Sequence, residues 1–89
     1  MHQFTLAIVN EKGLHARASA KFVETVERFD ARASVSRDGM EVSGDSIMGL
    51  MMLAAGIGTT IDVRVDGPEA DGLAAALSDL VGGRFGEEF

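Results

Sequence analysis

A histidine and an arginine two residues apart, His15 and Arg17, stand where the sequence changes from strand-like to helix-like patterning. Residues 4–9 alternate between two faces of a strand, whereas residues 18–29 carry apolar side chains at helical spacing. We therefore expect His15 at or just before the first turn of a helix, where the backbone N–H groups have no helical partner. These donors and the positive end of the helix dipole favour an anion, phosphate above all. An imidazole beside such an anion-binding site is well placed to carry a phosphoryl group on a ring nitrogen.

The charges around this histidine strengthen that interpretation. A lone histidine near a helix start is most often an ordinary surface residue, which is the alternative to be weighed. Here Lys12, Arg17 and Lys21 surround it with only Glu11 opposing, in a chain whose formal net charge is −6. A basic cluster in an acidic chain is stronger evidence for a functional site than a basic cluster in a basic chain. The other histidine, His2, lies near the N-terminus and is assigned no role.

Length and composition narrow the class of protein. A chain of 89 residues, 46% hydrophobic and 25% charged, is expected to form one soluble domain, residues 1–89. Without cysteine or a cluster of histidines, no disulfide, metal or cofactor is expected. Because the chain is acidic and has no aromatic stacking platform, it is a poor nucleic-acid binder. Since we find no signal peptide and no apolar run long enough to cross a bilayer, we expect a cytoplasmic protein with no membrane insertion.

The remaining patterns predict the elements that position the histidine. Residues 33–36 and 40–43 alternate on either side of Asp38-Gly39, a pair typical of a type I′ hairpin turn. The clearest strand is residues 61–66, with three β-branched side chains on one face. Because each strand has one apolar face, we expect an antiparallel sheet with helices on one side and water on the other.

Two more helices are expected after the first. A short apolar one spans roughly residues 47–53, and the last takes Pro68 as its first helical residue and stops at Gly82-Gly83. Residues 86–89 would form a loose tail. The predicted order is β-α-β-β-α-β-α, and the fold class is α+β: an open-faced β-sandwich with four antiparallel strands and three helices on one face.

A serine, Ser46, precedes the short apolar helix. Serine is a preferred N-cap, and a phosphate there would leave the helix intact while adding about −1.5 to −2 charge nearby. So short a helix cannot bury all of its apolar side chains, and exposed methionine and isoleucine suit a surface that meets several partners. We therefore take Ile47, Met48 and Met51 as partner-docking residues tuned by Ser46. The alternative is that all of them belong to the core.

The histidine motif and Ser46-Ile47-Met48-Gly49, at this spacing, closely resemble the histidine-containing phosphocarrier (HPr) family of the phosphoenolpyruvate-dependent phosphotransferase system. The resemblance covers essentially the whole chain in element order, motif positions and length. It implies a carrier rather than an enzyme: enzyme I would phosphorylate His15, and an enzyme IIA would receive the group. In the family the phosphate sits on Nδ1, with the arginine that matches Arg17 beside it. The N–H groups of Ala16 and Arg17 would hold the phosphoryl oxygens.

The resemblance also implies a regulator, and the chain departs from the family pattern. In some branches the serine matching Ser46 is the target of an HPr serine kinase/phosphorylase, and Asp45 adds a charge beside it here. Lys12 stands where many members carry a small polar residue. Ala18 replaces the usual proline and restores an N–H at the phosphate-binding site. Ala18 and Ser19 together resemble alphaproteobacterial and nitrogen-related members, which often have a regulatory role rather than a part in sugar uptake.

Two alternatives to a sugar-coupled carrier stay open. One is a purely regulatory, nitrogen-type relay member that is not coupled to sugar uptake. The other is a binding or scaffolding domain that never carries phosphate, and the basic cluster around His15 argues against it. In each case we expect a monomer.

Overall fold

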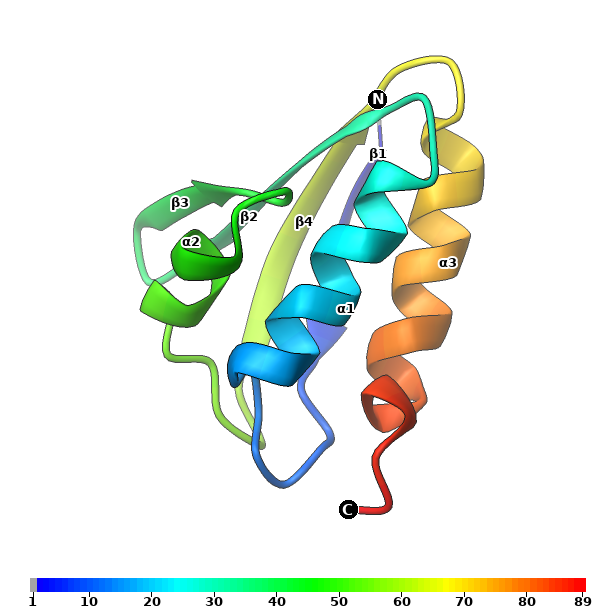
Figure 1. Ribbon diagram of the computed structural model, residues 1–89. Helices are drawn as coiled ribbons and strands as arrows, with labels where there is room; N and C mark the ends of the chain where they lie inside the picture. Colours follow the sequence, from blue (N-terminus) through cyan, green and yellow to red (C-terminus); the bar gives the residue numbers. More distant parts are fainter. Residues whose placement is uncertain (1) are drawn as a thin grey trace.

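The four strands form one antiparallel sheet in the order β1-β4-β2-β3, and the helices cover one of its faces (Figure 1). The structure is a computed structural model that describes residues 2–89. Its elements are β1 (His2–Ala7), α1 (Ala16–Glu27), β2 (Arg32–Arg37), β3 (Met40–Ser43), α2 (Ile47–Met52), β4 (Thr60–Asp66), α3 (Ala70–Gly82) and a short 3-10 helix, η1 (Arg84–Gly86). The predicted open-faced sandwich and its element order are confirmed.

The register of the sheet explains why one face is apolar. Phe4 of β1 lies opposite Val63 of β4, Val63 lies opposite Val35 of β2, and Val35 lies opposite Val42 of β3. These four side chains therefore form a row across the sheet on a single face. The adjacent row is polar, because alternation turns the neighbouring side chains to the other face, which carries no helix.

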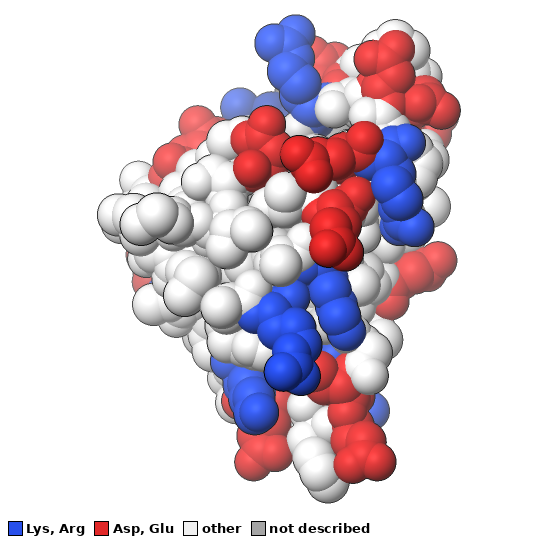
Figure 2. Space-filling view, in the orientation of Figure 1, with Lys and Arg blue, Asp and Glu red and all other residues white. Residues whose placement is uncertain are grey.

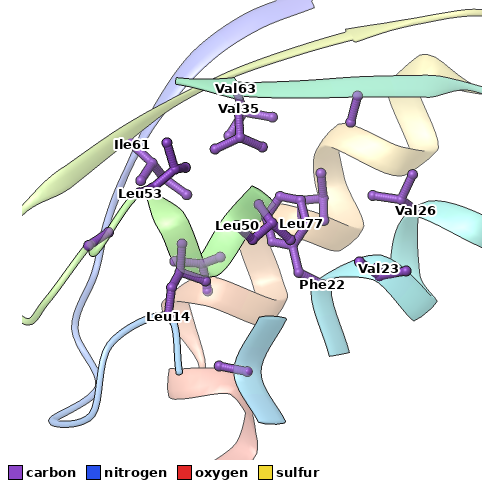
Figure 3. Close-up of a cluster of buried hydrophobic side chains, with 14 of the residues drawn as sticks. Leu14, Phe22, Val23, Val26, Val35, Leu50, Leu53, Ile61, Val63 and Leu77 are labelled. Carbon is purple, nitrogen blue, oxygen red and sulfur yellow. The ribbon is translucent and has the colours of Figure 1, made fainter. Parts of the chain in front are cut away.

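The helices meet the sheet through fully buried side chains. Phe22 of α1, Leu50 of α2 and Leu77 of α3 have no exposed surface and lie together in the core below Val35 and Val63 (Figure 3). The exclusion of this apolar surface from water is the main force that holds the three helices against the sheet. None of the helices among residues 2–89 has the length and apolarity that a bilayer crossing requires.

The hairpin turn follows its sequence signal. Asp38 and Gly39 both have positive φ, 51° and 81°, as a type I′ turn requires. Glycine takes such a conformation without a steric penalty, and aspartate tolerates it better than most residues. The Asp38-Gly39 prediction is therefore confirmed at the backbone level.

The last helix begins later than predicted. Its first residue is Ala70, with Glu69 as N-cap, so the assignment of Pro68 to the first helical position is wrong. Pro68 lies instead in a turn that closes when the N–H of Ala70 donates to the carbonyl of Gly67 (3.2 Å). The fixed φ of proline suits the second position of such a turn as well as a helix start, so the residue type alone could not separate them.

The C-terminal residues do not form the predicted loose tail. The ring of Phe85 in η1 is fully buried, and the N–H of Glu11 donates to the carbonyl of Phe89 (2.9 Å). Arg84 and Phe85 both take left-handed backbone conformations, with φ of 59° and 54°. Such conformations are unfavourable for residues with a side chain, and burial of the Phe85 ring compensates. The chain thereby turns back toward the start of α1.

Candidate functional site

His15 is the N-cap residue of α1. Its backbone is extended (φ −74°, ψ −179°), and its carbonyl accepts the first helical hydrogen bond, from the N–H of Ser19 (2.9 Å). The amides of Ala16, Arg17 and Ala18 therefore precede the first bonded turn and point out of the helix end. The side chain of His15 makes no capping hydrogen bond, which leaves the imidazole available at this end.

The loop before His15 is pressed tightly against another segment. Leu14 is buried in the core, and its N–H donates to the carbonyl of Ala55 (3.0 Å). Gly13 has a φ of 64°, and a Cβ at this position would lie 2.4 Å from the same carbonyl oxygen. Only glycine fits there without moving the backbone. His15 is thus held by a fixed residue on its N-terminal side and by a helix on its other side.

The predicted basic cluster is divided between two places. A pocket of about 250 Å³, called here the His15 pocket, is lined by Glu11, Lys12, His15, Arg17, Glu87, Glu88 and Phe89. Lys21 lies outside it, since its Nζ donates to the carbonyl of Phe85 (2.6 Å). Figure 2 shows basic and acidic side chains next to one another at the end of the molecule where the chain terminates. Only Lys12 and Arg17 of the predicted cations therefore line the pocket with His15.

Glu87 faces His15, a contact that the sequence patterns did not reveal. One carboxylate oxygen, Oε2, contacts Nε2 of His15, and the other, Oε1, accepts a hydrogen bond from Nδ2 of Asn10 (3.0 Å). Burial opposes ionisation of Glu87. The hydrogen bonds from His15 and Asn10, and the charges of His15 and Lys12, nevertheless bring the pKa of Glu87 below its ordinary value. The pocket therefore holds a carboxylate ion against the imidazole.

A sequence signal for this contact existed but was indirect. Phe85 is a large apolar residue two positions after the glycines at the end of α3, and residues 82–88 are otherwise glycine and charged residues. Such a residue suggests an anchored segment rather than a tail. Nothing local, however, indicates that Glu87 would meet a histidine 72 residues earlier in the chain.

Ser46 is the N-cap of α2, as its residue type predicts. Its Oγ accepts a hydrogen bond from the N–H of Gly49 (3.0 Å). A Cβ on Gly49 would lie 3.1 Å from that Oγ and 3.0 Å from the side chain of Val42, so there is little free space around the capping hydrogen bond. A substituent on the Ser46 oxygen would lie at the start of α2.

The apolar side chains of α2 divide into a buried and an exposed set. Leu50 is fully buried, whereas Ile47 is 40%, Met48 76% and Met51 43% exposed. The prediction that part of the set reaches the surface is confirmed, and the alternative that all of it is core is wrong. Met52, which was not singled out, is also exposed. Figure 2 shows that the surface over α2 carries no charged side chains and lies on the same face as a group of basic ones.

Comparisons with known proteins agree with one another. A family model described as "PTS HPr component phosphorylation site" matches residues 2–82. The phosphocarrier protein HPr of Cupriavidus necator is 47% identical over 98% of both chains, and that of Xylella fastidiosa (strain Temecula1) is 46% identical over 99% of both. Among solved structures, HPr-C-His of Thermoanaerobacter tengcongensis aligns with a TM-score of 0.94 at 37% identity, covering 100% of both chains.

Proposed function

Because the chain belongs to the HPr family of phosphocarrier proteins of the phosphotransferase system, we propose that it accepts a phosphoryl group on His15 from enzyme I and passes it to an enzyme IIA. It is a protein intermediate of a relay and not an enzyme. We propose further that it works as a monomer in the cytoplasm and that a serine kinase acting on Ser46 regulates it.

The observation that carries this proposal is the imidazole of His15 at the open end of α1. The amides of Ala16 and Arg17 and the guanidinium of Arg17 are donors suited to the phosphoryl oxygens. In the transfer, a ring nitrogen of His15 forms a bond to phosphorus while the bond from phosphorus to the donor breaks. An imidazole suits this step, because the ring nitrogen that carries no proton has a lone pair that can attack phosphorus.

The exposed set on α2 supports a docking role. Ile47, Met48 and Met51 are exposed on a helix that packs against α1, the helix that His15 caps. A partner that covers the uncharged surface over α2 would therefore also reach the basic group on the same face (Figure 2). A phosphate on Ser46, at the N-cap of α2, would place negative charge beside this surface and weaken docking.

The direct test is labelling with phosphoenolpyruvate and enzyme I, scored for acid-labile phosphate on this chain. The wild type should be labelled, and His15→Ala should not. The chain offers a matched control in His2→Ala, because this removes the only other imidazole and should leave labelling unchanged. Retained labelling of His15→Ala, with a native circular dichroism spectrum, would contradict the proposal.

A further inference from the structure

We propose that Glu87 and Asn10 are positioning residues for His15: Glu87 accepts a hydrogen bond from Nε2–H of the imidazole, and Asn10 holds the carboxylate in place. The inference rests on the proposed function and adds two residues that lie outside the histidine motif. It starts from two contacts made by one carboxylate, Oε2 with Nε2 of His15 and Oε1 with Nδ2 of Asn10 (3.0 Å).

The segment that carries Glu87 is anchored on both sides of it. Before it, the ring of Phe85 is fully buried and the carbonyl of Phe85 accepts a hydrogen bond from Nζ of Lys21 (2.6 Å). After it, the carbonyl of Phe89 accepts a hydrogen bond from the N–H of Glu11 (2.9 Å). The carboxylate is therefore brought to His15 by backbone contacts and packing, and does not depend on its own ion pair to reach the pocket.

The buried side chain of Asn10 makes two hydrogen bonds in the site and leaves one of its polar atoms unsatisfied. Its side chain is fully buried; Nδ2 donates to the carbonyl of Gly13 (2.9 Å) and to Oε1 of Glu87 (3.0 Å). Its Oδ1 is buried and has no hydrogen-bond partner among residues 2–89. An unsatisfied buried oxygen is unfavourable, so we attribute the presence of an amide at this position to the two hydrogen bonds that Nδ2 donates. Flipping the amide would set its oxygen against two acceptors, so the orientation is fixed.

The carboxylate decides which ring nitrogen can react. An ionised carboxylate only accepts hydrogen bonds, so the contact with Nε2 requires the proton of the neutral ring to lie on Nε2. The lone pair is then on Nδ1, which becomes the nucleophile. When Nδ1 bonds to phosphorus and the donor's bond to phosphorus breaks, the ring gains positive charge and keeps its Nε2 proton. Glu87 stabilises that charge, as an acidic residue does for a catalytic histidine in hydrolases.

The test measures a hydrogen bond and a rate in the same variants of the full chain. In the wild type, ¹⁵N-edited NMR should show an Nε2 proton of His15 that is protected from exchange with water. Glu87→Ala should lose this signal, and its kcat as the substrate of enzyme I should fall by about tenfold or more, with KM unchanged. The matched control is Glu27→Ala, which removes the same charge from an exposed residue at the end of α1 outside the His15 pocket and should change neither quantity.

A double-mutant comparison tests Asn10. If Asn10 acts through Glu87, Asn10→Ala should lower kcat in the wild-type background but add little to Glu87→Ala. Additive losses would show that Asn10 acts by another route and would overturn its part of the inference. The thermal midpoint of each variant reports any loss of fold.

The outcomes separate this inference from the proposed function. Wild-type kcat and a protected Nε2 proton in Glu87→Ala would overturn the role of Glu87, while loss of labelling in His15→Ala would still support the carrier. A wild-type chain that enzyme I cannot label would overturn both, since the inference rests on the carrier.

Discussion

Arg17 is the cation of the His15 pocket best suited to hold a phosphoryl group. No hydrogen bond or ion pair of its side chain is found within residues 2–89, whereas Lys21 is occupied by the carbonyl of Phe85. A guanidinium can donate two parallel hydrogen bonds to phosphoryl oxygens, which a lysine ammonium cannot match in geometry.

We therefore expect Arg17→Ala to slow phosphoryl transfer from enzyme I by about tenfold or more, because it removes charge-assisted hydrogen bonds worth roughly 1.5–3 kcal/mol each. Its thermal midpoint should hardly change, because the side chain is exposed. Arg17→Lys keeps the charge but cannot donate two parallel hydrogen bonds, so its transfer rate should lie between those of the wild type and Arg17→Ala. Transfer rate and thermal midpoint are the measurements, and a parallel loss in both would show a structural role instead.

Ser46 combines a structural and a proposed regulatory function in one oxygen. Since Oγ accepts the hydrogen bond from Gly49, Ser46→Ala should lower the free energy of unfolding by about 1 kcal/mol and leave binding to enzyme I unchanged. Ser46→Asp keeps a cap and suits the helix dipole, so its stability should hold. Its negative charge should weaken association with enzyme I by about 1–3 kcal/mol. Urea unfolding and the KM in the enzyme I reaction measure the two effects, and an unchanged KM for Ser46→Asp would argue against a docking role.

At the scale of the element, α2 shows how one short helix serves both the core and the surface. Leu50 lies in the core and Met48 is 76% exposed, because a step of two residues turns about 200° around a helix axis and places the two side chains on opposite sides of α2. Packing and docking should therefore be separable by mutation within the same element.

The pair Met48→Ala and Leu50→Ala tests this separation. Met48→Ala should raise the KM of this chain in the enzyme I reaction without changing its stability. Leu50→Ala should lower the free energy of unfolding by about 2–5 kcal/mol, because it leaves a cavity in the core. Chemical unfolding and enzyme I kinetics on both variants are the measurements. An unstable Met48→Ala, or one with wild-type KM, would contradict the docking role.

At the scale of the whole molecule, the parts that sequence analysis predicted are those with a local cause. Alternation in β4 and the Asp38-Gly39 turn each depend on neighbouring residues, so period and turn chemistry sufficed. Pro68 is compatible with both a turn and a helix start, so local pattern did not decide between them. The N–H of Glu69 donates to the carbonyl of Asp30 (3.0 Å), a contact between distant segments that no local pattern predicts. The Glu87 contact was missed for the same reason, because only the completed fold brings it to His15.

The stability of the folded chain should depend on pH through Glu87. Its pKa is lowered in the folded state from the ordinary 4.5, so its contribution is fully present above about pH 4.5 and is lost as pH falls through the folded pKa. Because Glu11 and Glu88 line the same pocket, the wild type should be compared with Glu87→Gln, which cannot titrate at position 87. Urea unfolding between pH 5 and pH 2 should show a stability difference in favour of the wild type that is largest near pH 5 and shrinks as the pH falls through the folded pKa of Glu87. A difference that stays the same down to pH 2 would mean that the Glu87 carboxylate contributes nothing as an ion, and that its contact with His15 is one of shape alone.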